Sequence, residues 1–271
     1  MRHEAGGWRL EAARDLCLAL AALAVVSLSA QTSPAAEGWV DQRAYGPLVC
    51  HADFPLNGLE PLLGEIAQIQ QELIRLLEIP PTNERIELLL FHDRSTYRRY
   101  LAGRFPNVPY RQALYVRSAG QGTVLAFQSD DLPVDLRHEC THAMLHAVLP
   151  MVPLWLDEGL AEYFEVPAAE RLNGNPHHSS VKWWMRFGRV PSMATLEAKQ
   201  SLDDMGRNEY RDSWAYVHFL LNGPPAARAE LVAMLRDIRS GTPPGQLSQR
   251  LGRLSPDLPG ELVEHFKTFG Q

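Results

Sequence analysis

The chain has 271 residues, of which 45% are hydrophobic and 21% are charged, so it is long enough to bury the core of one large domain or two small ones. Its formal net charge is −6, and its lysines and arginines form no long block. The composition therefore gives no electrostatic case for a nucleic acid or an anionic membrane as a partner.

Residues 1–36 differ from the rest of the chain. Leu16–Ala30 is an unbroken run of 15 apolar and small residues, followed by a polar stretch that contains Ser33-Pro34-Ala35, a small-x-small cleavage pattern. This length suits the apolar core of a signal peptide and falls short of the roughly 20 residues that span a bilayer. We predict an export signal. The alternatives are an uncleaved N-terminal membrane anchor and, third, a cytosolic helix or a wrongly assigned start. The first two place the folded part outside the cytoplasm, as a periplasmic, extracellular or anchored protein.

The following part of the chain mixes helix and strand patterns. Apolar residues recur at helical spacing until Pro80-Pro81 ends the first helix, and the glycines around Gln121 are typical of a hairpin between two strands. The predicted elements are a helix over Leu59–Leu77, a strand over 85–93, a short helix over 95–103 with Ser95 as its N-cap, and two strands over 112–118 and 122–130.

From residue 131 onward the pattern is helical. Two helices are expected on either side of a break at Pro150 and Pro153, and four more follow. They are predicted over Val134–Leu149, 154–166, 180–188, 209–223, 227–241 and 261–270. The order predicts an α+β fold, with a small mixed α/β half over residues 37–170, an all-helical half over residues 171–271, and a cleft between them.

Two histidines four residues apart, His138 and His142, form an HExxH motif with Glu139. On a helix, residues i and i+4 lie about 40° apart on one face and about 6 Å apart along the axis, so both imidazoles can bind one ion. Glu139 sits about 100° around the helix, beside the ion and not required as a ligand. In this geometry two neutral imidazoles bind Zn²⁺ and the carboxylate takes a proton from zinc-bound water. We therefore predict His138 and His142 as ligands and Glu139 as the catalytic base.

A catalytic zinc needs a third protein ligand and one open position. The helix after the proline break supplies Glu158, which lies 16 residues beyond His142, and a helix–turn–helix returns the chain toward its start. Glu158 is therefore the predicted third ligand of a single zinc ion per chain. Glu162 lies one turn further along the same face, where it can accept a hydrogen bond from Nδ1 of a ligand histidine, His138 in our prediction.

The HExxH motif and the segment WLDEGLAEYF, Trp155–Phe164, together resemble the gluzincin metallopeptidases. The aminopeptidase N type carries a similar WLxEG segment, and thermolysin has an acidic residue four positions after its ligand glutamate. The chain is most similar to the peptidase MA-like domains of exported bacterial proteins. The resemblance covers Leu136–Phe164, more loosely continues to Leu221, and implies the same three ligands and the same base. The 15-residue spacer between the second histidine and the ligand glutamate is shorter than is usual in the aminopeptidase type.

Three alternatives concern the ligand set. Glu162 could replace Glu158 as the third ligand, although it lies one turn further from the break between the helices. His146 continues the histidine face but lies about 12 Å along the axis from His138, too far to share its ion. The metzincin pattern requires a histidine six positions after His142, and that position is Val148.

The resemblance also implies a group that stabilises the oxyanion of a tetrahedral intermediate. The segment EYRDSWAYVHFLL is similar to the helix that contributes a tyrosine in aminopeptidase-type gluzincins. Tyr210 fits that pattern, with Ser213 as the small residue that follows it, and Tyr216 is the alternative.

Other residues have simpler interpretations. Cys50 and Cys140 are predicted as buried thiols or as one disulfide. His177 and His178 are expected on a solvent-exposed loop, and the pair Trp183-Trp184 is expected to pack between the two halves.

The sequence thus predicts an exported, zinc-dependent metallopeptidase, a hydrolase of peptide or protein substrates. No nucleic acid partner is expected, and no membrane contact beyond an N-terminal anchor. The alternative is a non-catalytic gluzincin-like domain that keeps zinc as a structural or binding element. The presence of Glu139 favours the enzyme, because a structural site has no use for that carboxylate and usually closes with four protein ligands.

Overall fold

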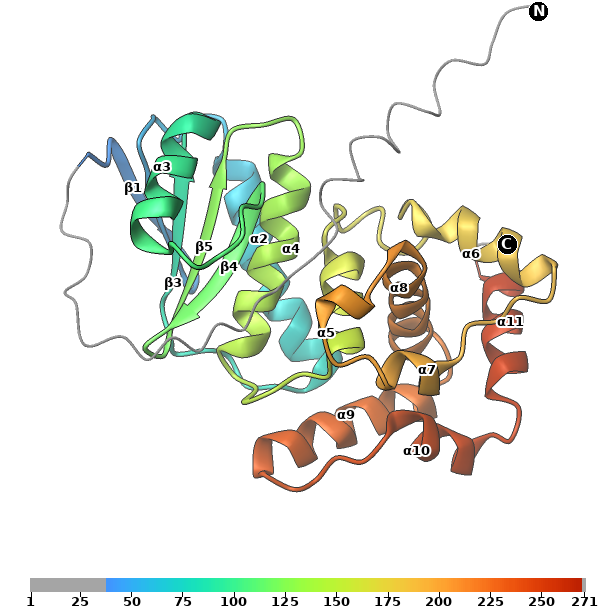
Figure 1. Cartoon of the computed structure of the whole chain (residues 1–271). Helices are drawn as coiled ribbons and strands as arrows, with labels where there is room; N and C mark the ends of the chain where they lie inside the picture. Colours follow the sequence, from blue (N-terminus) through green and yellow to red (C-terminus); the bar gives the residue numbers. More distant parts are fainter. Residues whose placement is uncertain (1–37, 270–271) are drawn as a thin grey trace, which may run out of the picture.

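The computed structural model describes residues 38–269, and the predicted export signal lies outside them. The predicted α+β class is confirmed: a mixed sheet with its helices is followed by a helical C-terminal part (Figure 1). The strands are β1 (Asp41–Tyr45), β2 (Leu48–Ala52), β3 (Ile86–Phe91), β4 (Ala113–Ser118) and β5 (Gln121–Phe127). The helices are α2 (Glu60–Leu77), α3 (Arg94–Arg104), α4 (Leu132–His146), α5 (Leu154–Phe164), α6 (His177–Arg186), α7 (Met193–Glu197), the 3₁₀ turn η1 (Leu202–Asp204), α8 (Arg207–Asn222), α9 (Pro225–Ser240), α10 (Leu247–Leu254) and α11 (Leu258–Thr268).

The strands form one sheet in the order β1-β2-β3-β5-β4. β2, β3 and β5 run parallel to one another, while β1 and β4 pair antiparallel at the two edges. The predicted hairpin is β4–β5, in which Ser118 pairs with Gln121. Its turn residues Ala119 and Gly120 both have positive φ, as a two-residue hairpin turn with the twist of the strands requires. β4 is the last strand in this order and pairs with β5 alone, so it is an edge strand.

Strands β1 and β2 were not predicted. β1 is half exposed and carries charged residues at alternate positions, so its apolar signal is weak. β2 is only five residues long, and its buried positions are Leu48, Cys50 and Ala52. Cys50 and Cys140 are both buried free thiols, which is one of the two arrangements expected for them.

The two faces of the sheet bury different clusters, because side chains alternate along each strand. Leu88, Leu90 and Val124 face the large cluster that also contains α2 and α4. Leu89, Phe91, Leu125 and neighbouring residues face a smaller cluster that is closed by Tyr97 and Leu101 of α3. Helix α4 packs directly on β4 and β5. The HExxH helix therefore lies beside the open edge of the sheet.

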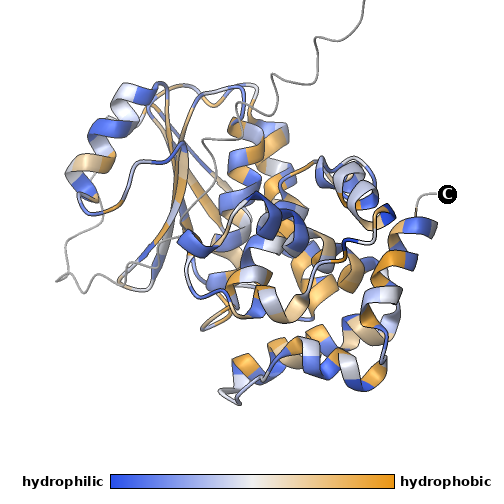
Figure 2. Ribbon diagram, turned by 45° about the vertical axis from the view of Figure 1, so that its right-hand side comes forward, coloured by the Kyte–Doolittle hydropathy of each residue, from blue (hydrophilic) through white to orange (hydrophobic). Residues whose placement is uncertain are grey.

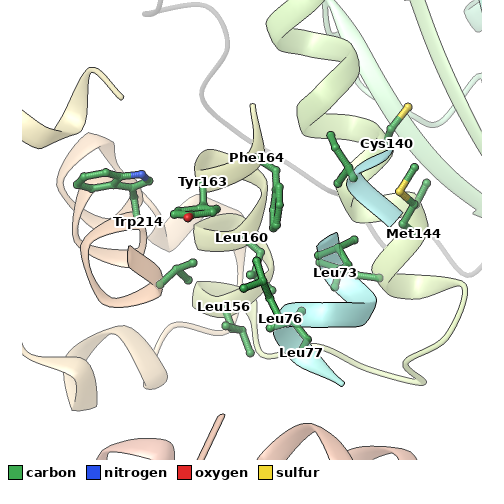
Figure 3. Close-up of a cluster of buried hydrophobic side chains, with 14 of the residues drawn as sticks. Leu73, Leu76, Leu77, Cys140, Met144, Leu156, Leu160, Tyr163, Phe164 and Trp214 are labelled. Atoms are coloured by element: carbon green, nitrogen blue, oxygen red, sulfur yellow. The ribbon is translucent and has the colours of Figure 1, made fainter. Parts of the chain in front are cut away.

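Helix α5 joins the two parts of the molecule. Leu160 and Phe164 belong to the same buried cluster as Leu73 of α2 and Met144 of α4, and Trp214 of α8 extends that cluster into the helical part (Figure 3). One continuous core thus runs from the sheet to α11. Many of the helices carry both hydrophobic and hydrophilic stripes (Figure 2). Within residues 38–269, no helix combines the length and the apolar character that crossing a membrane requires.

Gly159 allows α5 and α8 to approach closely. A Cβ atom at this position would lie 2.7 Å from the carbonyl oxygen of Ser213 and 2.8 Å from Cγ2 of Val217. The backbone of α8 cannot yield without moving Trp214, which is completely buried. The absence of a side chain at 159 therefore lets α5 lie close to α8, and this packing positions the neighbouring Glu158.

Replacement of Gly159 by alanine should lower the free energy of unfolding by about 1–3 kcal/mol, the usual effect of overpacking a well-packed contact. Gly64 in α2 is the matched control, because a Cβ there would meet no atom within 4 Å. Gly64→Ala should raise the free energy of unfolding by about 0.5–1 kcal/mol through helix propensity. Urea denaturation of both variants tests this pair, and equal effects of the two substitutions would contradict the close contact.

Candidate metal centre

Helices α4 and α5 bring the motif residues together. α4 begins at Leu132 with a proline in its first turn, and it turns Leu136, Cys140 and Ala143 into the core. The motif histidines lie on a different side of the helix and face α5. His142 is buried, whereas the His138 side chain keeps 19% of its surface exposed. The site is therefore held by the core and open to solvent at His138.

Three side-chain atoms converge on one point. Nε2 of His138 lies 3.2 Å from Nε2 of His142, and Oε2 of Glu158 lies 3.7 Å and 3.8 Å from these two nitrogens. Ligands placed about 2.0–2.1 Å from a tetrahedral zinc are separated by about 3.4 Å. The three predicted ligands are thus spaced as donors to one ion of this size.

The far ring nitrogens of the two histidines are held by carboxylates. Nδ1 of His142 lies 2.9 Å from Oδ1 of Asp157, and Nδ1 of His138 lies 3.2 Å from Oε2 of Glu165. A carboxylate that accepts the Nδ1–H leaves the Nε2 lone pair free, which is the tautomer that binds a metal ion. Both rings are oriented for ligation through Nε2.

The same carboxylates control the charge of the rings. Burial disfavours the protonated form of His142, but the carboxylates of Asp157 and Glu158 outweigh burial and raise its pKa to about 9. The pKa of His138 is also raised, because the carboxylates of Glu158 and Glu165 outweigh its burial. The carboxylates thus favour the protonated form of each ring when no metal ion is bound. A metal ion that binds them must displace these protons.

Glu139 does not belong to the group of three converging side chains, but its charge acts on His138. Its Oε2 accepts a hydrogen bond from the backbone N–H of Tyr115 at 2.7 Å. Tyr115 belongs to β4, so the bond ties the carboxylate to the edge of the sheet. This contact holds the carboxylate of the expected base without using a ligand position.

Asp157 links two histidines of α4. While Oδ1 contacts His142, Oδ2 lies 2.8 Å from Nε2 of His146, and all three side chains are buried. The group His142, His146 and Asp157 could also hold a metal ion. Its separations of 2.8–2.9 Å are those of hydrogen bonds and are shorter than the distance of about 3.4 Å between ligands of one zinc. The group is better described as a hydrogen-bond chain that supports His142.

Glu162 is placed differently from our expectation. The carboxylate bonded to Nδ1 of His138 is that of Glu165, whereas Oε2 of Glu162 lies 2.8 Å from Nε2 of His177. Glu162 still has an oxygen within 4.8 Å of a ring nitrogen of His138 and an oxygen of Glu165. The difference arises because Glu165 is the residue of the α5 C-terminus that faces His138. The prediction of a solvent-exposed loop for His177 was wrong, since this residue begins α6 and turns back to the site.

The structure separates the two tyrosine candidates. Burial raises the pKa of Tyr210, and the charges of Glu158 and Glu162 raise it further, so its phenol lies within electrostatic reach of these carboxylates. The hydroxyl of Tyr216 instead donates to the carbonyl oxygen of Pro191 at 2.8 Å. Tyr210 is therefore the tyrosine near the metal-binding groups.

Sequence reasoning missed Asp157, Glu165 and the role of His146. The signals were present: Asp157 precedes the predicted ligand glutamate, and His146 follows His142 by one helical turn. Their roles depend on how α4 and α5 are rotated against each other, which spacing within one helix does not define. The contact of His177 with Glu162 could not be predicted, because an irregular loop separates the two residues in the sequence.

Comparison of the chain with models of known protein families gave no match. Comparison with curated proteins also gave no match. The interpretation of the site therefore depends on its own geometry.

The raised pKa of His142 should make the free energy of unfolding depend on pH. In the metal-free protein, the raised pKa stabilises the fold fully below pH 6.5, the ordinary histidine value, and this contribution is lost as the pH rises through about 9. Asp157→Asn removes the first of the two carboxylates that raise the pKa. The unfolding free energy of this variant, measured with a chelator present, should therefore fall less steeply between pH 6.5 and 9 than that of the wild type. Asp203→Asn, at an exposed carboxylate of η1 outside the site, is the control for a general loss of charge. An unchanged slope in Asp157→Asn would contradict the assigned cause.

Proposed function

We propose that this protein is a zinc-dependent metallopeptidase. The observation that carries the proposal is the convergence of His138, His142 and Glu158 on one point, with Glu139 beside them and outside the ligand group. Two imidazoles and one carboxylate leave a tetrahedral ion one open position, which is typical of catalytic zinc. A structural zinc site usually has four protein ligands. The donor set thus favours catalysis over a structural role.

The chemical nature of the donors supports zinc. Neutral imidazole and carboxylate ligands at these separations suit a tetrahedral ion, and the buried side chains exclude the many waters that Mg²⁺ keeps. Asp157, Glu158 and Glu162 on α5 and Glu165 at its C-cap are all buried. A divalent cation among them would offset part of their desolvation penalty.

Different residues of the chain have different roles in the proposed reaction. A bound zinc ion would polarise the carbonyl of a peptide bond and lower the pKa of a water molecule in its open position. Glu139, held by the N–H of Tyr115, accepts a proton from the attacking water and delivers it to the leaving nitrogen. Tyr210 donates a hydrogen bond to the carbonyl oxygen as negative charge develops there.

Strand β4 supports a peptide as the substrate. It is an edge strand, and the N–H of Tyr115 points away from β5 toward Glu139. Backbone groups on the outer side of an edge strand can pair with an extended chain. A peptide that lies along β4 would pass Glu139 and His138, whose side chain is partly exposed. The resemblance of HExxH and WLDEGLAEYF to the gluzincin pattern is consistent with this proposal, as is the expected export of the chain.

Substitution of Glu139 tests the enzyme against the non-catalytic alternative. Glu139→Gln should keep the fold and bind zinc as the wild type does, while hydrolysis falls by about 10²–10⁴-fold or more, because the general base is lost. Zinc content is measured by elemental analysis, and hydrolysis with a peptide library, with and without chelator. Wild-type cleavage by Glu139→Gln would remove Glu139 from the mechanism. Absence of any cleavage by zinc-loaded wild type across the library would favour the non-catalytic module.

Substitution of the ligand Glu158 should lower zinc affinity more than substitution of the carboxylates that support the histidines. Glu158→Gln removes a predicted ligand and should release zinc at micromolar concentrations. Glu165→Gln removes the partner of His138 Nδ1 and should weaken zinc binding by about 10–100-fold. Glu162→Gln should change zinc affinity less than Glu165→Gln does. Competition with a chromophoric chelator measures all three. If Glu162→Gln had the largest effect, Glu162 and not Glu158 would be the third ligand.

A further inference from the structure

Helix α6 exposes two neighbouring aromatic side chains. Trp183 is 56% exposed and Phe187 is 63% exposed, which makes them the most exposed aromatic residues among residues 38–269. Their ring centroids lie 4.7 Å apart, so they form one apolar surface. The expectation that Trp183 packs between the two halves was wrong. Figure 1 shows α6 at an outer edge of the helical part.

The surroundings of these rings are basic. Residues 177–190 contain no aspartate or glutamate, although the whole chain carries a net charge of −6. Arg186 and Arg189 are exposed and Lys182 is half-buried. Within the part of the chain that the structure describes, none of these three forms an ion pair. We call Lys182, Trp183, Arg186, Phe187 and Arg189 the α6 patch.

Helix α8 packs beneath α6 and does not neutralise the patch. Its Asp212 forms an ion pair with Arg211 at 2.7 Å, and Glu209 lies 3.7 Å from Lys199. Arg189 and Arg211 both stack on the ring of Trp184, at 4.4 Å and 5.5 Å from its centroid. These contacts give the exposed rings a firm base while the charge of Arg189 stays available.

We propose that the α6 patch docks the folded protein on an anionic phospholipid surface. Aromatic side chains favour the interface between water and lipid, and lysine or arginine beside them is attracted to acidic headgroups. The patch is small and lies on one short helix and the three residues that follow it. A stable protein interface needs about 1,000 Å² or more of buried surface, whereas a bilayer can accept two rings and a few charges. Because charge and aromatic rings are combined here, a bilayer suits the patch better than a second copy of this chain, which would bring the same positive charges together.

Docking through α6 would place the candidate metal centre close to the bilayer. His177 at the start of α6 contacts Glu162 of the candidate metal centre, and the helix is about 15 Å long. The local concentration of basic residues also explains why net charge alone gave no indication of such a surface.

Vesicle co-sedimentation tests the proposal without reference to catalysis. A chain that begins at residue 37 keeps every described element and lacks the apolar run, and cooperative unfolding checks its fold. It should bind vesicles that contain phosphatidylglycerol, bind phosphatidylcholine vesicles much more weakly, and dissociate as salt screens the charges. Trp183→Ala/Phe187→Ala should reduce partitioning by roughly tenfold or more, and Lys182→Gln/Arg186→Gln/Arg189→Gln should remove the preference for anionic lipid. In the full chain the order of the variants should be the same.

Matched substitutions outside the patch serve as controls. Leu254 is 52% exposed on α10 and Arg236 is exposed on α9. Leu254→Ala and Arg236→Gln/Arg239→Gln should bind vesicles as the wild type does. Failure to bind anionic vesicles, or equal losses in patch and control variants, would overturn the proposal. The same holds if the patch variants left vesicle binding intact and changed only the KM for a peptide, or only dissociated a dimer.

Discussion

The pairing of buried carboxylates on α5 with histidines on α4 is the interaction on which the site depends. Asp157, Glu158 and Glu165 are all buried, and each faces one of the histidines of α4. Buried charges destabilise a fold unless they are paired and hydrogen-bonded. Their pairing fixes the rotation of α5 against α4, and with it the point where the two Nε2 atoms meet Glu158.

The rest of the fold holds these two helices in place. α4 packs on β4 and β5, and α5 packs against α8 through the gap that Gly159 provides. The edge strand then contributes the backbone N–H that holds Glu139, and α8 contributes Tyr210. The residues assigned to the proposed reaction thus come from different elements, and one continuous core holds these elements in fixed positions.

Much of this could be predicted from the sequence, for physical reasons that differ between the parts. His138, His142 and Glu139 follow from helical geometry within one segment, and Glu158 follows from the short return of the chain after Pro150 and Pro153. The fold class followed from long periodic segments, whereas the five-residue strands β1 and β2 carry too little signal. The partners of the histidine Nδ1 atoms depend on helix–helix rotation, so Glu162 was chosen where Asp157 and Glu165 have the role. Exposure of Trp183 depends on which side of α6 meets α8, which periodicity over ten residues does not determine.

The ligand set is tested most directly by the position of the metal in crystals of the zinc-loaded protein, located by anomalous scattering at the zinc edge. We expect one peak per chain, about 2.0–2.2 Å from Nε2 of His138, Nε2 of His142 and a carboxylate oxygen of Glu158, with Glu139 not bound to it. A peak bound by His146 and Asp157 instead, or no peak within reach of His138, would contradict it.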